Sequence, residues 1–418
     1  MSDKINKVSV IGYKGVEDLE LEPGRFNLIT GRNNTGKTSF LQSLELLYRP
    51  TRISGYSRNI DSLINRDYNK ATLTGQIDDE TEEIILKYID KKEAKDNLMM
   101  ASKKSLFHRN QLEVRLNDLR DNLDADYEFK VKDVLDSIEE AFEDVIQERI
   151  TEIQESKIQD NFLVVKVNDR SHIFYNIGAL QPLFRDREEI RKDILDNERL
   201  DEYEEIVKNH LIRDFVFRHP HNRSGFLSKP ATRENLKFIR SAKFDRVGLE
   251  KDEEDNAVKI DDIGDYIKEN GILDNLKTFD LDSLVFKEDG QKYQIPFEFM
   301  GDGFKSIVGF LWRLIDEKEN KVVLVEEPEN HMHPGYIREL VSFLVKISKE
   351  EDIQLFITTH DNDFINEFFA DHFNEEEKEF LKEELRLFQF KTGGFVEEFD
   401  YVGATEHLKD LQIDLRGL

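Results

Sequence analysis

Three things are scarce or missing in this 418-residue sequence: cysteine, long apolar runs and positive charge. Without cysteine the chain can form no disulfide bond, no thiolate nucleophile and no cysteine-ligated zinc site. No apolar stretch is long enough to cross a bilayer, and residues 1–10 alternate polar and apolar side chains, unlike a signal peptide. The formal net charge of −28 disfavours indiscriminate binding to nucleic acid. We therefore expect a cytoplasmic protein that has no membrane partner.

The apolar residues that are present predict strands and helices in alternation near the N-terminus. Residues 7–13 and 18–22 predict a β-hairpin, and residues 26–30 predict a short buried strand. Residues 71–77 and 83–89 predict a second pair of strands. Between these pairs we expect a helix that ends before Pro50, because apolar residues recur at helical spacing at Phe40, Leu41, Leu44 and Leu47.

The middle of the chain predicts a mostly helical insertion in an α/β head. Apolar residues at i, i+3 and i+4 spacing form one stripe from Val131 to Ile150 and a second from Ile190 to Leu211. From Gln294 onward the order is helix, strand, helix, strand, helix and a final hairpin. We therefore expect one head in two parts, residues 1–92 and 236–418, separated by a helical insertion over residues 93–235.

One region departs from the acidic composition. Residues 213–246, called the basic segment below, hold nine basic residues and only three acidic ones. The nine are Arg213, Arg218, Arg223, Lys229, Arg233, Lys237, Arg240, Lys243 and Arg246. The segment is either a nucleic-acid surface or a set of partners for the acidic helices of the insertion, and we expect the second.

The residues Gly-Arg-Asn-Asn-Thr-Gly-Lys-Thr, 31–38, match the G-x-x-x-x-G-K-[ST] pattern of a phosphate-binding loop. Glycine lets successive backbone N–H groups turn towards phosphates, and asparagine tolerates unusual dihedrals. Lys37 would face the β- and γ-phosphates, and Thr38 would offer its hydroxyl to Mg²⁺. The following helix favours an anion at its N-terminus. We predict that ATP contacts Arg32, Asn33, Asn34, Thr35, Gly36, Lys37, Thr38 and Ser39.

A pair of acids follows a second buried strand. Residues 322–325 are Val-Val-Leu-Val, and Glu326 and Glu327 come directly after them. Two acids at the carboxyl end of a strand suit a nucleotide site, where one holds Mg²⁺ through water and the next polarises the attacking water. We predict that Glu326 and Thr38 hold Mg²⁺ and that Glu327 is catalytic.

Two more loops complete the predicted site. Residues 300–306, Met-Gly-Asp-Gly-Phe-Lys-Ser, precede an amphipathic helix, and a glycine-flanked helix start can bind an anion. Gly301, Gly303 and Lys305 are the candidate nucleotide contacts there. His360 directly follows a strand over residues 354–359, and we predict it as a catalytic sensor of the γ-phosphate.

Together these residues resemble the ABC-type P-loop ATPase heads of the SMC and OLD-like families, above all the stand-alone AAA ATPases found beside prokaryotic anti-phage defence genes. The resemblance covers about residues 1–90 and 236–418. Its motifs are Walker A at 31–38, the ABC signature at 300–305, Walker B at 326–327, the D-loop at 329–334 and the switch histidine at 359–360. The family implies Mg²⁺-dependent ATP hydrolysis and a head-to-tail homodimer, or a higher oligomer, with ATP held between Walker A of one subunit and the signature of the other.

The chain departs from that family at four points. Glu326 stands where aspartate is usual, which makes the contact to Mg²⁺ one methylene longer. Gly301 replaces the signature serine, and Lys305 is a candidate to compensate for the lost hydroxyl. The Q-loop glutamine stays open between Gln76 and Gln181. The chain ends soon after its last hairpin, so we expect no TOPRIM nuclease of the OLD type.

Histidines offer weaker alternatives. His331 and His333 lie near two glutamates and could form a metal site, but the D-loop accounts for them better. A second group, His210, His219 and His221, has no acidic partner at ligand spacing.

The function that these motifs predict is an ATP-driven dimerising switch that regulates a protein effector in anti-phage defence. One alternative is a DNA-repair or chromosome-associated SMC-like ATPase that acts directly on DNA. Another is a nucleotide-binding scaffold with little turnover. We expect a protein partner, because the rest of the acidic surface would repel DNA.

Overall fold

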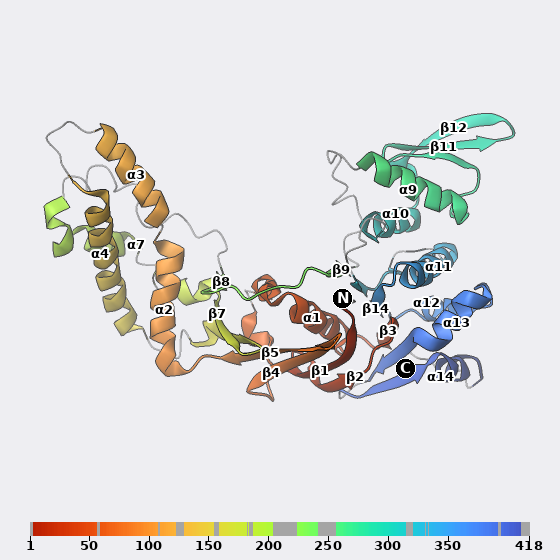
Figure 1. The fold of residues 1–418 in the computed structure, drawn as a ribbon, viewed down its shortest axis with the longest axis horizontal. Helices are drawn as coiled ribbons and strands as arrows, with labels where there is room; N and C mark the ends of the chain where they lie inside the picture. The colour runs from red at the N-terminus through yellow and green to blue at the C-terminus, as the bar shows by residue number, and fades with distance from the viewer. Residues whose placement is uncertain are drawn as a thin grey trace. The chain divides into compact units, whose positions relative to one another are not determined.

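The chain forms two compact units in a computed structural model (Figure 1). Unit 1 contains Met1–Arg49, Leu73–Glu82 and Arg233–Leu418, and unit 2 contains Pro50–Thr72 and Glu83–Thr232. No helix within the described ranges has both the length and the apolar character that a bilayer span requires. The structure describes residues 3–56, 59–107, 109–122, 129–153, 159–181, 183, 187–203, 224–240, 256–314, 321–330, 332, 334–391 and 394–410.

Unit 1 is built on a six-stranded sheet with the order β16-β15-β3-β14-β13-β9. Neighbours from β15 to β9 run parallel, and only β16 pairs antiparallel. The central strands are almost wholly buried and apolar, as expected where both faces of a parallel sheet are covered. The strands are β3 (Phe26–Gly31), β9 (Leu236–Arg240), β13 (Val322–Glu326), β14 (Gln354–Thr358), β15 (Leu385–Phe390) and β16 (Val396–Asp400).

Helices cover both faces of this sheet. On β14, Leu355 and Ile357 share a core with α10 and α11, whereas the ring of Phe356, which points to the other face, contacts Phe40 of α1. The predicted order from residue 294 onward is confirmed as far as the hairpin of β15 and β16, except that two helices, α12 and α13, stand where one was expected; α14 follows the hairpin, which was predicted to be the last element. The helices are α1 (Lys37–Tyr48), α10 (Asp302–Leu314), α11 (Pro334–Glu350), α12 (Asn362–Glu367), α13 (Glu375–Glu384) and α14 (Tyr401–Thr405).

A smaller antiparallel sheet, which the sequence patterns did not predict, also belongs to unit 1. It has the order β10-β11-β12 and follows helix α9 (Asn256–Glu269). Phe279 of β10 and Phe297, just after β12, join the core that holds α10. The strands are β10 (Leu276–Phe279), β11 (Ser283–Glu288) and β12 (Gln291–Pro296).

A seven-stranded sheet has the order β2-β1-β4-β5-β6-β7-β8. The predicted hairpin is confirmed, because β1 pairs antiparallel with β2 from Val8–Leu21 to Tyr13–Val16. Its last three strands belong to unit 2, so this unit contains strands as well as helices. The strands are β1 (Ile5–Tyr13), β2 (Val16–Leu21), β4 (Lys70–Ile77), β5 (Glu80–Tyr88), β6 (Phe162–Val167), β7 (Arg170–Tyr175) and β8 (Gly225–Phe226).

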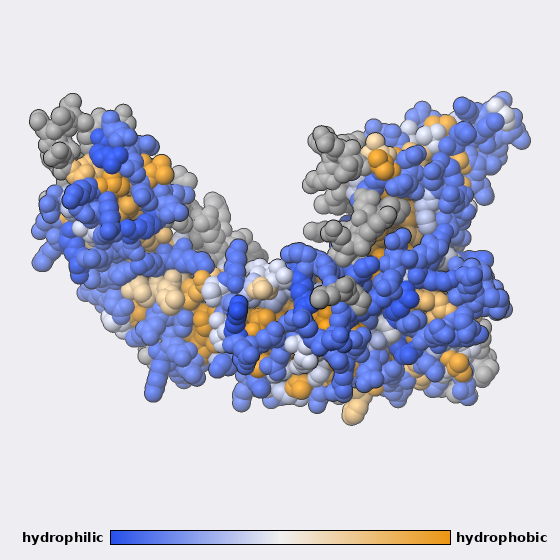
Figure 2. All heavy atoms as spheres, viewed as in Figure 1, coloured by the Kyte–Doolittle hydropathy of each residue, from blue (hydrophilic) through white to orange (hydrophobic). Residues whose placement is uncertain are grey.

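The helices of unit 2 share a core of their own. The predicted stripe of α4 (Val131–Glu152) is buried, including Leu135, Ile138 and Phe142. Hydrophilic residues cover most of the face seen in Figure 2, with small apolar areas among them. The other helices are α2 (Lys91–Leu106), α3 (Arg109–Asn122) and α7 (Arg187–Leu195).

Part of the basic segment lies within the described residues, and its arginines are paired. Arg233 contacts Glu82 at 2.5 Å, Glu80 at 2.6 Å and Asp3 at 3.3 Å. Arg240, at the end of β9, lies 3.1 Å from the buried carboxylate of Glu45 on α1. We expected these arginines to pair with acidic helices of the insertion, and that expectation is wrong for Arg233 and Arg240. Arg213, Arg218, Arg223, Lys243 and Arg246 lie outside the described residues.

We predict that Arg233→Ala destabilises the protein by about 1.5–3 kcal/mol, because the half-buried acids Asp3 and Glu82 lose charged hydrogen bonds. Thermal unfolding of the purified variant measures this. Arg120→Ala is the control, since it removes only an exposed pair with Asp121 and should cost less than about 1 kcal/mol. Equal melting temperatures for the two variants would contradict the structural role of Arg233.

Candidate functional site

The predicted phosphate loop, the acidic pair and His360 lie at one edge of the six-stranded sheet. In register, Glu326 of β13 lies opposite Thr358 of β14, and Thr358 lies opposite Ile29 of β3. Since the three strands are parallel neighbours, their carboxyl ends coincide (Figure 1). The loops that follow them carry the phosphate-loop motif, the acidic pair and His360, and such an edge is where ligands bind in parallel α/β sheets.

The phosphate loop depends on residues that tolerate a positive φ. Gly31 has φ +138° and Gly36 has φ +100°. A Cβ atom at Gly31 would lie 2.2 Å from the carbonyl oxygen of Phe390, so only glycine fits there. Of the two asparagines, Asn34 adopts a positive φ of 65° and Asn33 does not. The loop then enters α1 at Lys37.

The side chains of the loop divide into exposed and buried ones. Arg32, Asn33 and Asn34 are exposed and Ser39 is half-buried, whereas Thr35 is buried and donates to the Arg32 carbonyl at 2.8 Å. Within the described part of the chain, the backbone N–H groups of Gly36, Lys37 and Thr38 make no hydrogen bond. Donors at the start of a helix with no partner in the chain suit an anionic ligand.

Lys37 points back into the loop. Its ammonium donates to the carbonyl oxygens of Gly31 at 2.6 Å and Arg32 at 2.8 Å. Burial lowers the pKa of Lys37, and the carboxylates of Glu327 and Glu329 oppose that shift. The site therefore holds one positive charge, the Lys37 ammonium, close to two carboxylates. A bound phosphate group would interact with the same positive charge.

Thr38 and Glu326 come together across the sheet edge. The Thr38 hydroxyl donates to Oε1 of Glu326 at 2.6 Å, so the extra methylene of glutamate does not keep this carboxylate away. A hydroxyl and a carboxylate are oxygen ligands of the kind that Mg²⁺ takes together with phosphate oxygens. Among the described residues, no group of three or more His, Asp or Glu side chains is placed so that it could hold a metal ion on its own.

Glu327 is held in a strained backbone conformation. Its φ is +46°, the left-handed region that a residue with a side chain rarely occupies, and its N–H donates to the Thr358 carbonyl at 2.9 Å. One carboxylate oxygen accepts from the Asn330 side chain at 2.9 Å, and the other lies 3.2 Å from Nδ1 of His360. The turn and these two partners fix the direction of the carboxylate.

Glu329 is a site residue that the sequence patterns placed only in the D-loop region. Its side chain is 5% exposed, and Oε1 accepts from the Thr359 hydroxyl at 2.5 Å and the His360 N–H at 3.4 Å. Its Oε2 atom is buried and has no partner in the described part of the chain. Burial raises the pKa of Glu329 to about 7. A third acid three residues after the predicted Mg²⁺ ligand was the signal available in the sequence.

The segment predicted as the signature begins α10. A Cβ atom on Gly303 would lie 2.7 Å from the ring of Tyr336, so packing on α11 requires glycine there. Nothing lies within 4 Å of a Cβ built on Gly301. The Lys305 ammonium donates to the carbonyl of Glu298, just before this segment, at 2.9 Å. The nucleotide contacts of Gly301, Gly303 and Lys305 stay predictions.

Other predicted residues lie elsewhere. Gln76 is exposed on β4, and Gln181 belongs to unit 2, so the Q-loop position stays open. The histidines considered as metal ligands are outside the described residues: His210, His219, His221, His331 and His333.

We predict that Glu329 makes the free energy of unfolding depend on pH. Its folded pKa of about 7 exceeds the unfolded value of about 4.3, so its favourable contribution is complete below that lower value and is lost as pH rises through 7. Between pH 5 and 8 the free energy of unfolding of the nucleotide-free protein should fall by roughly 1–3 kcal/mol more than that of the Glu329→Gln variant. Melting temperatures across this range measure the difference, and parallel pH profiles would contradict it.

Comparison with known proteins agrees with this geometry at the level of the family. The family described as "AAA domain, putative AbiEii toxin, Type IV TA system" matches residues 26–366. The curated "Uncharacterized protein MJECL11" of Methanocaldococcus jannaschii is 31% identical over 125 residues, 28% of this chain and all of that protein.

Two solved SMC heads are similar in outline. The SMC head domain from Thermotoga maritima has a TM-score of 0.43 and 10% identity, over 95% of this chain and 98% of that one. The SmcHead bound to the C-winged helix domain of ScpA has a TM-score of 0.45 and 10% identity, over 96% and 99%. Neither likeness carries information about activity at this level. The family match spans more than half of the sequence and includes β3, the loop 31–38 and β13, so the chain belongs to this family of AAA-domain proteins.

Proposed function

We propose that this protein binds ATP with Mg²⁺, hydrolyses it, and uses the cycle as a dimerising switch that regulates a protein effector. The observation that carries the proposal is the meeting of Thr38 with Glu326, and of Glu327 with His360, beside the phosphate loop. Membership of an AAA-domain family supports nucleotide binding.

In this proposal, different groups of the chain bind the phosphates and the metal ion. In this proposal the N–H groups at the start of α1 bind the β- and γ-phosphates. Lys37 leaves the carbonyls of Gly31 and Arg32 and turns its ammonium to the phosphates. Thr38 and Glu326 hold Mg²⁺, which when bound neutralises phosphate charge during transfer. The contact between the Thr38 hydroxyl and the Glu326 carboxylate supports this assignment of the two residues.

Glu327 is the group that acts on water. Its carboxylate accepts a proton or orients the attacking water, which reacts with the γ-phosphate in line with the leaving oxygen. Asn330 and the strained turn keep the carboxylate in place before substrate arrives. His360, whose side chain is 44% exposed, can exchange Glu327 for a phosphate oxygen and so report the γ-phosphate.

The signature segment supports the proposed dimerisation. The Lys305 ammonium donates to the Glu298 carbonyl just before the segment, and nothing lies within 4 Å of a Cβ built on Gly301. We propose that residues 301–305 of one subunit close on the nucleotide of another, as the resemblance to ABC-type heads implies. The family description names a toxin of a toxin–antitoxin system, which supports a regulated effector in defence.

We predict that Lys37→Ala abolishes ATP binding, because it removes the buried cation that faces the phosphates. Isothermal titration with ATP and Mg²⁺ measures the loss, which should be at least about 100-fold in Kd, or about 2.7 kcal/mol. The control Lys349→Ala removes a surface lysine paired with Glu376 and should bind normally. Unchanged affinity of the Lys37 variant would remove the basis of the phosphate-loop assignment.

We predict that Glu327→Gln binds ATP but hydrolyses it at least about 100-fold more slowly, since the amide keeps the shape but cannot act as the base. The trapped ATP state should be a dimer by light scattering. Adding Lys305→Glu should abolish that dimer, while the surface change Glu376→Gln should not. Turnover of Glu327→Gln at the normal rate would assign the catalysis to another residue.

A further inference from the structure

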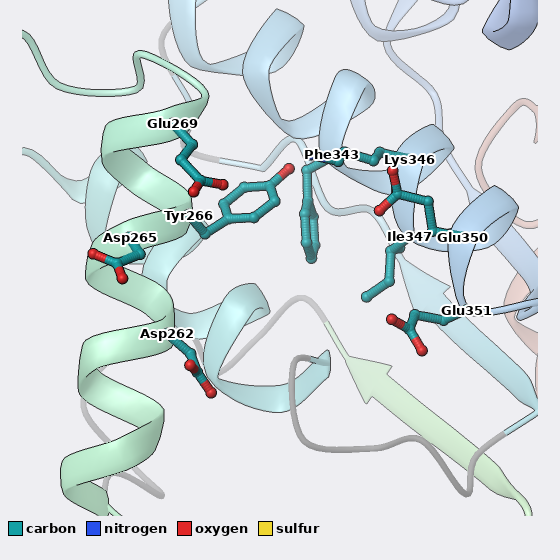
Figure 3. Close-up of a pocket in the computed structure, with 9 residues that line it drawn as sticks. All are labelled: Asp262, Asp265, Tyr266, Glu269, Phe343, Lys346, Ile347, Glu350 and Glu351. Atoms are coloured by element: carbon teal, nitrogen blue, oxygen red, sulfur yellow. The ribbon is translucent and has the colours of Figure 1, made fainter.

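A cavity lies between the C-terminal halves of α9 and α11 and is lined by none of the predicted nucleotide-site residues (Figure 3). Its volume is about 250 Å³. Tyr266 of α9 and Phe343 of α11 form an aromatic wall, with ring centroids 5.1 Å apart and planes at 80°. Ile347 extends this wall with an aliphatic side chain. The cavity therefore has an apolar surface that can pack against a hydrocarbon stem.

The rim of the cavity is acidic and mostly uncompensated. Among the described residues that line the cavity, the only cation is Lys346, whose ammonium lies 5.5 Å from the centre of the Tyr266 ring. Asp265 pairs with Lys268 at 2.7 Å, whereas the other four carboxylates make no ion pair within the described part of the chain. Burial, and then the negative charge of Glu350, raise the pKa of Tyr266. The rim carboxylates are Asp262, Asp265, Glu269, Glu350 and Glu351.

These features select one kind of occupant. A volume of about 250 Å³ is below the roughly 300–1,000 Å³ of pockets for small-molecule ligands, so it suits a single long side chain. The acidic rim repels anions such as nucleotides and attracts a cation. An arginine side chain fits best, because its stem packs on apolar surface, its planar head stacks on aromatic rings, and its five donors can reach several carboxylates.

The two helices that line the cavity are also linked to segments of the proposed switch, α11 through the chain and α9 through its contact with α10. α11 begins seven residues after Glu327, and its Ile347 lies about 20 Å from the start of the helix. α9 contacts α10, the helix of the signature segment, where Lys259 lies 4.8 Å from the centre of the Trp312 ring. A group bound in the cavity would thus contact α11, which follows the acidic pair in the chain, and α9, which packs on the signature helix α10.

We propose that this cavity is a docking pocket for an arginine side chain of a protein partner, held by the aromatic pair Tyr266 and Phe343 and by the surrounding carboxylates. The proposal rests on the proposed function, in which a protein effector is regulated. It names the chemistry that such an effector must present.

The test uses the full chain and two peptides, acetyl-Gly-Leu-Arg-Leu-Gly-amide and the same peptide with citrulline, which keeps the shape of arginine without its charge. Saturation-transfer NMR measures contact of each with the protein. We expect saturation of the arginine methylenes, at least fivefold weaker for citrulline, and a decrease with added salt. No signal with the arginine peptide, or equal signals for both peptides, would overturn the proposal.

A matched pair of variants locates the binding. Asp262→Asn with Glu351→Gln should reduce the arginine signal at least fivefold, whereas Asp274→Asn with Glu288→Gln, an equal change at exposed acids outside the cavity, should not. Equal loss in both, or in neither, would place the peptide elsewhere. Displacement of the peptide by spermidine at a tenfold lower concentration would identify a polyamine site and overturn the partner assignment.

ATP titrations of the same variants separate this proposal from the proposed function. The cavity variant should bind ATP as the unchanged protein does, because its residues lie outside the nucleotide site. Arginine binding in a protein that neither binds nor hydrolyses ATP would leave the pocket standing and remove the switch.

Discussion

The parallel alignment of β3, β14 and β13 is the constraint on which the candidate site depends. Because Ile29, Thr358 and Glu326 are in register, loops that are about 300 residues apart in sequence leave the sheet side by side. The buried apolar strands fix that register, since any slip would expose them or separate Thr38 from Glu326. Stability and the candidate site therefore depend on the same sheet edge, and the strained turn at Glu327 is held by Asn330 of its own loop and by Thr358 and His360 at the end of β14.

Sequence patterns predicted the parts of this edge that depend on local residue types. The phosphate loop has glycine at Gly31 and Gly36, where φ is positive, and an apolar strand before two acids is visible without a structure. The hairpin of β1 and β2 and the stripe of α4 are equally local, and they were predicted correctly. The predicted boundaries of the insertion stay predictions, and unit 2 adds strands to its helices.

The features that the sequence could not predict arise from contacts between distant residues. Glu329 joins the candidate site because it is buried against Thr359. The partners of Arg233 come from β5 and from the N-terminus. Strands β10 to β12 are short and partly exposed, so their apolar pattern is weak. The cavity beside Tyr266 exists only where two helices meet. In each case the sequence shows which residues are present but not which distant residues they contact.

The central claim is that ATP is held between the phosphate loop of one subunit and the signature segment of another. The most direct measurement is ATP turnover in a mixture of two inactive variants, Lys37→Ala and Lys305→Glu. A mixed head-to-tail dimer contains one site with both parts intact, so the account predicts that activity returns on mixing. Two variants that stay inactive together, although each still dimerises with the unchanged chain, would contradict it.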